Sequence, residues 1–322
     1  MKRKKIVILI IVVLGIILLG WLYLYLSQAS FKCGDYTYRF RHGNKRYGYE
    51  CSVEVNKYSG TNSDVKIPSH FLFFEIKYIG NESFEGNTHL EKIDIPDTVE
   101  WIGRNAFQDC INLRSVTLGE KLKIIDWRAF FNCSSLRDIS LPDTLTTIAG
   151  GSFSSSGLIG IHIPESVYII DDGAFSNCKG LKEVVGGMGL KQIGNSVFKD
   201  TPWLKGYKED FVFINNILVA YKGSDKEVFI PDGTIGTSPE AFYDTEVESI
   251  HVPDSCTPYY LYFSDKLVES QGKVKVYFSD TYSFQNGGLV GLIEEATIFV
   301  APKDSLAIKF AQENGIEYII EE

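Results

Sequence analysis

Histidine, methionine and tryptophan are scarce in this sequence, and the residue patterns of common enzyme sites are missing. There are five histidines, two methionines and four tryptophans among 322 residues. The histidines show no metal-ligand spacing such as His-Glu-x-x-His; they are His42, His70, His89, His162 and His251. No Gly-x-Ser-x-Gly motif occurs, and no glycine pair precedes the Lys-Ser or Lys-Thr of a phosphate-binding loop. We therefore predict no catalytic residues, no metal site and no cofactor, and expect that the protein is not an enzyme.

Positive charge is also in short supply. Thirty-two Lys and Arg residues stand against 41 Asp and Glu residues, which gives a formal net charge of −9. Four of the basic residues form the run Lys2–Lys5, so the rest of the chain carries −13. A surface of this sign repels nucleic acid and anionic membranes. It would attract a basic protein, although an acidic surface can also serve only to keep a domain soluble.

A long uncharged run follows the basic residues. It extends from Ile6 to Leu26, and its 21 residues would form a helix of about 31 Å, enough to cross a hydrocarbon core of about 30 Å. Basic residues before such a span stay in the cytoplasm. We therefore predict a cytoplasmic tail at 1–5, a transmembrane signal anchor at 6–26 and an extracellular remainder. The alternative is a secreted protein, cleaved near Ala29 after the small residues of Ser27-Gln28-Ala29.

In contrast to these rare residues, phenylalanine recurs along the chain at nearly constant spacing. The intervals are 23, 23, 23, 22, 23 and 44 residues, and the positions are Phe84, Phe107, Phe130, Phe153, Phe175, Phe198 and Phe242. A fixed period in this range indicates a solenoid, in which each turn buries its apolar side against its neighbours. Within one period apolar and polar residues alternate in two short stretches, which predicts two short strands per turn. Stacked turns about 4.8 Å apart would bring the phenylalanines into one column.

The repeated phrase can be written L-x-x-I-x-I-P-x-x-V-x-x-I-G-x-x-A-F-x-x-C, and it resembles the BspA-like, or Treponema-type, leucine-rich repeat family. The match extends from about Val65 to Pro253, with departures at Gly186-Gly187, Ser156 and Thr201 and an interruption near Trp203. The resemblance implies a mainly-β leucine-rich repeat solenoid and a cell-surface protein of the adhesin and ligand-binding kind. It brings no catalytic residues with it.

The six cysteines do not suggest a disulfide framework. Cys110, Cys133 and Cys178 each stand three residues after a repeat phenylalanine, where Ser156 and Thr201 stand in other turns. A position that accepts Cys, Ser and Thr favours a small buried side chain, so we predict inert interior thiols. Cys33 and Cys51 flank a predicted hairpin and could pair outside the cell. Cys256 has no evident partner.

The repeat also defines the domains. Residues 31–62 are predicted to form an N-terminal β cap, 63–255 the solenoid, and 256–322 a C-terminal cap. A hairpin insertion is predicted at 210–222, centred on Asn215-Asn216, because Asn tolerates a positive φ. A short helix is predicted at about 304–314, with Asp304 at its N-cap and Gly315 at its end.

The outward residues of the first strand in each turn are the predicted binding face, since solenoids usually bind through such rows. The residues of this face are Asp94, Arg114, Thr117, Arg137, Ser140, Ile159, His162, Lys182 and Val185. The predicted function is binding of a protein or glycan at the cell surface. Alternatives are a structural spacer or envelope-assembly component that binds no ligand, or a cell-wall enzyme with its site in the caps, for which Asp265, Glu269 and His42 are the only candidate groups.

Overall fold

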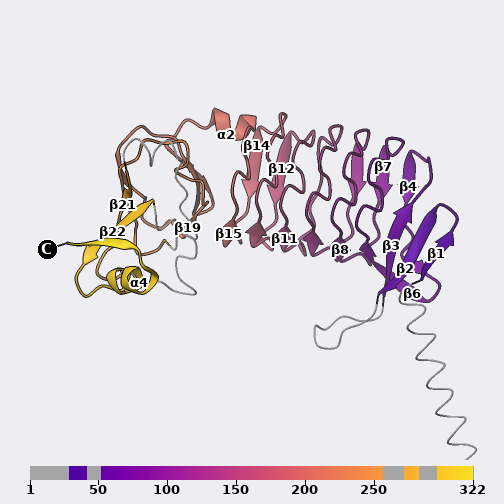
Figure 1. The fold of residues 1–322 in the computed structure, drawn as a ribbon. Coiled ribbons are helices and arrows are strands. Elements are labelled where there is room, and N and C mark those ends of the chain that lie inside the picture. Colours follow the sequence, from indigo (N-terminus) through magenta and orange to yellow (C-terminus); the bar gives the residue numbers. More distant parts are fainter. Residues whose placement is uncertain (1–28, 42–51, 257–271, 283–295, 322) are drawn as a thin grey trace, which may run out of the picture.

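The computed structural model shows an elongated stack of coils (Figure 1) and describes residues 29–41, 52–256, 272–282 and 296–321. A coil is one repeat of the solenoid; it consists of a first strand, a corner, a second strand and a segment that carries the repeat phenylalanine. The first strands are β4 (Asp64–Lys66), β7 (Lys92–Asp94), β9 (Ser115–Thr117), β12 (Gly160–Ile163), β14 (Glu183–Gly186), β18 (Glu227–Phe229) and β20 (Ser249–His251). The second strands are β6 (Phe74–Ile79), β8 (Trp101–Ile102), β10 (Ile124–Ile125), β11 (Thr147–Ile148), β13 (Ile169–Ile170), β15 (Gln192–Ile193) and β19 (Gly236–Thr237). The fold is therefore the mainly-β solenoid that the repeat predicts.

The second strands from β6 to β15 and the N-terminal cap share one sheet. In the cap, β1 (Ser30–Cys33), β2 (Tyr36–Arg41) and β3 (Ser52–Tyr58) pair antiparallel. β3 then pairs in parallel with β6, and the sheet continues through β8, β10, β11 and β13 to β15. A short strand, β5 (His70–Phe71), forms a hairpin with the start of β6. The cap thus covers the first coil by extending its sheet, which removes one open edge.

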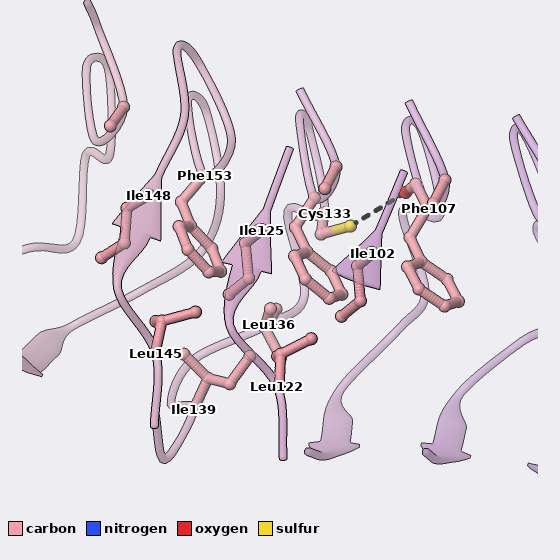
Figure 2. Packing of buried hydrophobic residues seen from close by; sticks show 14 of the residues in the cluster. Ile102, Phe107, Leu122, Ile125, Cys133, Leu136, Ile139, Leu145, Ile148 and Phe153 are labelled. Carbon is pink, nitrogen blue, oxygen red and sulfur yellow. Dashed lines mark hydrogen bonds between the residues drawn. The ribbon is translucent and has the colours of Figure 1, made fainter. Parts of the chain in front are cut away.

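The repeat phenylalanines form the core of the coils. From Phe84 to Phe198 the centroids of successive rings lie 4.9 to 5.5 Å apart, and all seven repeat phenylalanines are at most 1% exposed. Figure 2 shows Phe107 and Phe153 in line beside Ile102, Ile125 and Ile148 of the second strands. Each ring therefore packs against the same ring of the next coil, which is how a repeat too short to enclose its own apolar side excludes water.

The backbone around each phenylalanine forms a third set of hydrogen bonds between coils. In the coil of Phe107, the N–H groups of Asn105, Phe107 and Asp109 donate to carbonyl oxygens of the next coil at 2.8 to 3.0 Å. Asn105 and Asp109 have φ angles of 52° and 59°. Positive φ two residues before and after the phenylalanine recurs in each coil from Phe84 to Phe198. This conformation turns alternate N–H groups to one side, which explains the frequent Asn, Asp and Gly at these positions.

The predicted hairpin region holds β16 (Phe211–Ile214) and β17 (Ile217–Tyr221), which pair antiparallel, with Asn215 at φ 52°. A short helix, α2 (Pro202–Gly206), precedes them. The 44-residue interval does not divide evenly. The N–H of Tyr221 donates to the carbonyl of Ala241, the residue before Phe242, at 2.7 Å, and the N–H groups of the repeat phenylalanines from Phe84 to Phe175 donate to the equivalent carbonyl of the next coil. Tyr221 therefore takes the phenylalanine position, 23 residues after Phe198 and 21 before Phe242.

The C-terminal region continues the stack. β21 (Val274–Tyr277), β22 (Thr297–Pro302) and β23 (Glu317–Glu321) pair in parallel with β20 and with one another. Residue 256 is therefore no boundary in this sheet. The buried core instead divides near Leu218 and Val219, which belong to two different clusters. The hairpin, where the phenylalanine spacing breaks, is thus the divide within the solenoid.

Two details differ from the sequence-based expectation or fall outside the described residues. Helix α4 (Leu306–Asn314) has Ser305, not Asp304, as its N-cap, because the Ser305 hydroxyl accepts a hydrogen bond from the N–H of Ile308 at 3.3 Å. Gly315 ends this helix with φ 72°.

The described parts of the chain contain no helix with the length and apolar character needed to cross a membrane. The predicted anchor at 6–26 lies outside them.

Candidate functional site: two sheet faces and a junction pocket

The predicted binding face lies on the first strands, and most of its side chains reach solvent. Thr117, His162 and Lys182 are exposed, Ile159 and Val185 are 51% and 43% exposed, and Asp94 is half-buried. Thr117 donates a hydrogen bond to the Asp94 carboxylate at 2.9 Å. The residues are therefore available to a ligand, but their chemistry changes from charged at β7 to apolar at β14.

This face is not one continuous sheet, which corrects the expectation of a single extended row. β4, β7 and β9 form one sheet, and β12 and β14 form another. Arg137 and Ser140 lie between them in residues 136–141, which form no strand. Between this segment and the residues that lead into β12 there is one backbone hydrogen bond, from the N–H of Ile159 to the carbonyl of Arg137 at 3.0 Å. The two halves of the predicted face are therefore not joined by a continuous ladder of backbone hydrogen bonds on this side of the coils.

The second strands form a continuous face, which the repeat pattern alone did not predict as a binding surface. Parallel pairing aligns one outward residue from each of six strands, and none of these residues is buried. The aligned residues are Tyr78, Trp101, Ile124, Thr147, Ile169 and Gln192. We call them the second-strand row. An apolar residue directly before the inward Ile, repeated at Trp101, Ile124 and Ile169, was the signal that could have revealed it.

Specific contacts hold the N-terminal end of this row in place. The ring centroids of Tyr78 and Trp101 lie 6.4 Å apart, and the Arg41 guanidinium lies over the Tyr78 ring at 4.6 Å. The Trp101 indole N–H donates to the Asp126 carboxylate at 3.2 Å. A large aromatic side chain held in one orientation loses little conformational freedom when it binds a ligand, which is why such residues often dominate interfaces.

A line of alternating charges runs beside the row. The Lys77 ammonium lies 3.3 Å from the Glu100 carboxylate, and the Lys123 ammonium lies 2.7 Å from it. Burial opposes ionisation of Glu100, but the hydrogen bonds and positive charges of Lys123 and Lys77 outweigh burial and hold its pKa below the ordinary value of 4.5. The row therefore has a polar border with fixed charges, as protein interfaces commonly do.

A pocket of about 320 Å³ lies where the regular coils end. One wall is the segment Ser196–Asp200, and the other includes Val219–Lys222 and Ala241. Side-chain hydrogen bonds cross the junction at a few places. The Ser238 hydroxyl donates to the Gly194 carbonyl at 2.9 Å, the Ser196 hydroxyl donates to the Glu240 carboxylate, and the Asn215 side-chain amide donates to the Met188 carbonyl at 3.1 Å. The pocket marks the gap between two stacks whose backbones are no longer hydrogen-bonded to each other.

The thiols of the repeat cysteines are buried in the core and hydrogen-bonded to the backbone of neighbouring coils. Cys110, Cys133 and Cys178 are fully buried, and their thiols donate to the carbonyl oxygens of Phe84, Phe107 and Phe153 at 3.0 to 3.2 Å. Burial raises the pKa of Cys110 to about 12 and raises the pKa values of Cys133 and Cys178. A thiol that stays protonated is a poor nucleophile and a poor metal ligand.

Other sequence candidates fall outside this picture. Cys33 has a free, exposed thiol, and its suggested partner Cys51 lies outside the described residues. The same is true of His42, Asp265 and Glu269. Within the described ranges, no group of three or more His, Cys, Asp or Glu side chains is placed to hold a metal ion.

Comparison with known proteins gives the family. The family model described as "BspA type Leucine rich repeat region" matches six copies, over residues 77–205 and 151–268, which together make up more than half of the chain. No curated protein matches the sequence.

Solved structures of similar fold come from bacteria. A leucine-rich cell surface protein from Faecalibacterium prausnitzii A2-165 is 21% identical with a TM-score of 0.51, over 86% of this chain and 89% of its own. A leucine-rich repeat protein from Bacteroides ovatus ATCC 8483 is 22% identical with a TM-score of 0.45, over 84% of this chain and 78% of its own. At this level of identity the likeness concerns the fold alone.

Proposed function

We propose, from the premise that this chain belongs to the BspA-type leucine-rich repeat family, that it is a membrane-anchored cell-surface protein that binds a protein or glycan ligand through one face of its solenoid. Binding, not catalysis, is the activity proposed, because repeat proteins of this kind act through extended surfaces. The second-strand row is assigned as the main contact surface.

The observation that supports this assignment is the unbroken register of the row. Six outward residues lie side by side on one sheet, whereas the first-strand face is divided at residues 136–141. A ligand that touches several coils needs their relative positions to be fixed before it binds, since ordering them on binding would weaken affinity. Trp101 supplies a rigid aromatic group with a polar N–H at the start of the row.

A pull-down with the full chain in detergent, from surface extracts of the cells that carry or meet the protein, identifies the ligand. Affinity is then measured for the wild type and for Trp101→Ala. We expect at least a tenfold loss of affinity, about 1.4 kcal/mol, because truncated aromatic contacts at interfaces commonly cost this much or more. Treatment of the extract with protease or with glycosidase distinguishes a protein from a glycan ligand.

The chain offers a matched control. Trp127 is also a partly exposed tryptophan, 41% exposed, but it lies outside the second-strand row. Trp127→Ala should leave affinity unchanged. Charge reversal at Arg114 and Lys182 tests the first-strand face in the same assay. A loss confined to these reversals would move the site to that face, and the absence of any saturable ligand would favour a structural spacer.

The anchored topology is a separate part of the proposal. It is supported by the uncharged run 6–26 and by the basic residues before it. The mass of the mature N-terminus distinguishes an anchor from a signal peptide cleaved near Ala29. Protease treatment of intact cells should remove the repeats, and their survival inside the cells would contradict an extracellular location.

A further inference from the structure

The hairpin of β5 and β6 carries two strongly exposed apolar side chains at its tip. Phe71 pairs with Phe74, which leaves Leu72 and Phe73 as a two-residue loop. Phe73 is 95% exposed and Leu72 is 68% exposed, so Phe73 is the most exposed large apolar residue in the described parts of the chain. Isolated apolar residues on a surface are common, but an aromatic ring almost wholly in water at a projecting tip is not.

The loop residues are also unsuited to the backbone they occupy. Leu72 has φ 58°, in the left-handed region that glycine and asparagine adopt most readily. Two-residue hairpin loops favour Asn-Gly, Asp-Gly or a glycine for this reason. The sequence has Leu-Phe instead. The conformation of the turn therefore does not explain why Leu72 and Phe73 occupy these positions. We look for the reason in what their side chains contact.

The tip lies at the end of the sheet from which the N-terminal segment arrives. β1 begins at Ser30 opposite Arg39 and runs away from the end of β2 at Arg41. β3 starts opposite Arg41, and β6 runs parallel to β3. The hairpin tip therefore projects beyond the end of β2 and the start of β3. Figure 1 labels β6 at this end of the sheet.

The reach of the residues between the uncharged run and β1 matches the distance by which the hairpin tip projects beyond Ser30. Three residues, 27–29, separate the uncharged run from β1. Fully extended, they bring Ser30 no farther than about 14 Å from the end of that run. The register places the tip between three and four residues beyond the level of Ser30, which corresponds to about 12 Å at the usual strand rise. When the strands stand along the bilayer normal, the tip thus reaches the level at which the run leaves the membrane.

We propose that Leu72 and Phe73 contact the lipid surface of the membrane that anchors the chain. This inference rests on the anchor in the proposed function. Aromatic side chains favour the interfacial region of a bilayer, and removing two apolar side chains from water stabilises the contact. Together with the anchor, the tip gives the N-terminal cap two attachments to the membrane. Two attachments restrict the angle of the solenoid relative to the bilayer more than a single attachment does.

The test uses the full chain reconstituted in phosphatidylcholine vesicles with or without bromine on the acyl chains, which quenches tryptophan fluorescence inside the bilayer. Phe73→Trp adds a reporter at the tip. Met188→Trp is the matched control, because Met188 is also 68% exposed but lies far along the solenoid. We expect the emission added by Trp at position 73 to be quenched by the brominated lipid, and the emission added at position 188 to be unaffected.

The wild type provides the check on the anchor itself. Trp21 lies near the end of the uncharged run, so its emission should be quenched in the same vesicles. Quenching of Trp21 without quenching at position 73 would overturn the tip contact and leave the anchor in place. Absence of both would overturn the anchor and, with it, the contact.

A second variant separates a membrane role from a packing role. Leu72→Gly combined with Phe73→Asn places glycine at the position with positive φ and removes the apolar tip. In detergent, this variant should unfold at the same temperature as the wild type or higher. A lower unfolding temperature would show that the side chains support the fold, and would overturn the inference.

Discussion

The coils before residue 200 and those after it solve the same packing problem in different ways. From Phe107 to Phe198 successive rings are parallel within 2° to 7°. Beyond Phe198, the ring of Trp203 is tilted by 59° against Phe198, and Tyr221 is tilted by 38° against Phe242. The regular coils also share two unbroken sets of backbone hydrogen bonds, those of the second strands and those around the phenylalanines. In the described residues neither set continues from the Phe198 coil to the next, and the first strands are not paired there either.

The two regions differ in whether equivalent residues of neighbouring coils meet. When repeats are 22 or 23 residues long, the phenylalanine, the inward Ile and the positive-φ residues of neighbouring coils all meet their counterparts. A constant length alone does not secure these pairings: the 23 residues from Phe198 to Tyr221 form α2 and the hairpin of β16 and β17 instead of regular strands, and the pairings fail there. The hairpin and α2 fill the gap with tilted aromatic rings, and the core divides there. We therefore expect the two regions to differ in how they unfold, with largely independent cores.

Truncating a repeat phenylalanine should give the largest effect. Phe130→Ala should destabilise the regular coils by about 3–5 kcal/mol, because a buried ring leaves a cavity that stacked neighbours cannot fill. Urea unfolding followed by the fluorescence of Trp101 and Trp127 reports this region, and the reactivity of the buried Cys256 thiol reports the other.

The reciprocal variant tests independence. Phe242→Ala should expose Cys256 at lower urea while the tryptophan transition stays in place, and Phe130→Ala should do the reverse. Phe229→Ala serves as the control, because Phe229 is 62% exposed. If both variants shift both signals equally, the two regions form one cooperative unit and the comparison fails.

Close contact between coils gives the next largest effect. A Cβ atom at Gly189 would lie 1.7 Å from the carbonyl oxygen of Glu165 in the preceding coil. Gly189→Ala should therefore destabilise the regular coils by about 1–3 kcal/mol. Gly206, in α2 between the regions, has no atom within 4 Å of such a Cβ. Gly206→Ala should be neutral or stabilise by up to about 1 kcal/mol, since it restricts the unfolded chain. Equal effects in thermal unfolding would contradict the difference in packing.

Alkaline pH should weaken both regions through their thiols. Burial raises the pKa values of Cys110 and Cys256 to about 12, from an ordinary value of 9.0. Below pH 9 these thiols are protonated in both states, so stability does not depend on them. As the pH rises above 9, the unfolded thiol ionises while the folded thiol does not, and stability falls by about 1.4 kcal/mol per thiol at pH 10.

The matching variant isolates this effect from other groups that titrate at high pH. Cys110→Ser places at this position the residue type found at Ser156, and it should reduce the loss of stability between pH 7.5 and pH 10. Cys33→Ser, at an exposed position, should leave that loss unchanged. An identical pH dependence for wild type and Cys110→Ser would contradict the assignment.

Surface charge should matter least. Because the pKa of Glu100 is lowered, its contribution to stability is present above the ordinary value of 4.5 and is lost as the pH falls below it. Glu100→Gln should lower stability at pH 7 by less than about 1 kcal/mol, since its partners are partly exposed. The difference between the variant and the wild type should shrink as the pH falls below 4.5, and high salt should shrink the difference at pH 7. A difference that stays constant as the pH falls would assign the effect to packing.

The sequence predicted the arrangement inside each coil better than the arrangement between distant coils. The phenylalanine spacing and the Cys, Ser and Thr at one position gave the solenoid fold, because local period alone decides which side chains meet in adjacent coils. Residues 136–141 kept the sequence pattern of a first strand and yet form none. Strand pairing needs backbone atoms of two coils at hydrogen-bonding distance, which a side-chain pattern does not specify.

The candidate face shows the same limit. Arg137 and Ser140 were placed on one surface with Asp94 and His162 by analogy between repeats, but they lie in a segment that is not part of either first-strand sheet. The second-strand row was present in the sequence as apolar residues at an outward position. Only the parallel pairing from β6 to β15 showed that these positions are continuous.

By itself, the sequence determined the family, the period of the coils, the buried phenylalanines and thiols, and an apolar segment of membrane-spanning length. The tertiary structure alone decided where the stack divides, that Tyr221 takes a phenylalanine position, and which face is unbroken. The reason is physical: hydrophobic burial follows from side-chain periodicity along the chain, whereas register and continuity depend on backbone hydrogen bonds between segments about 23 residues apart.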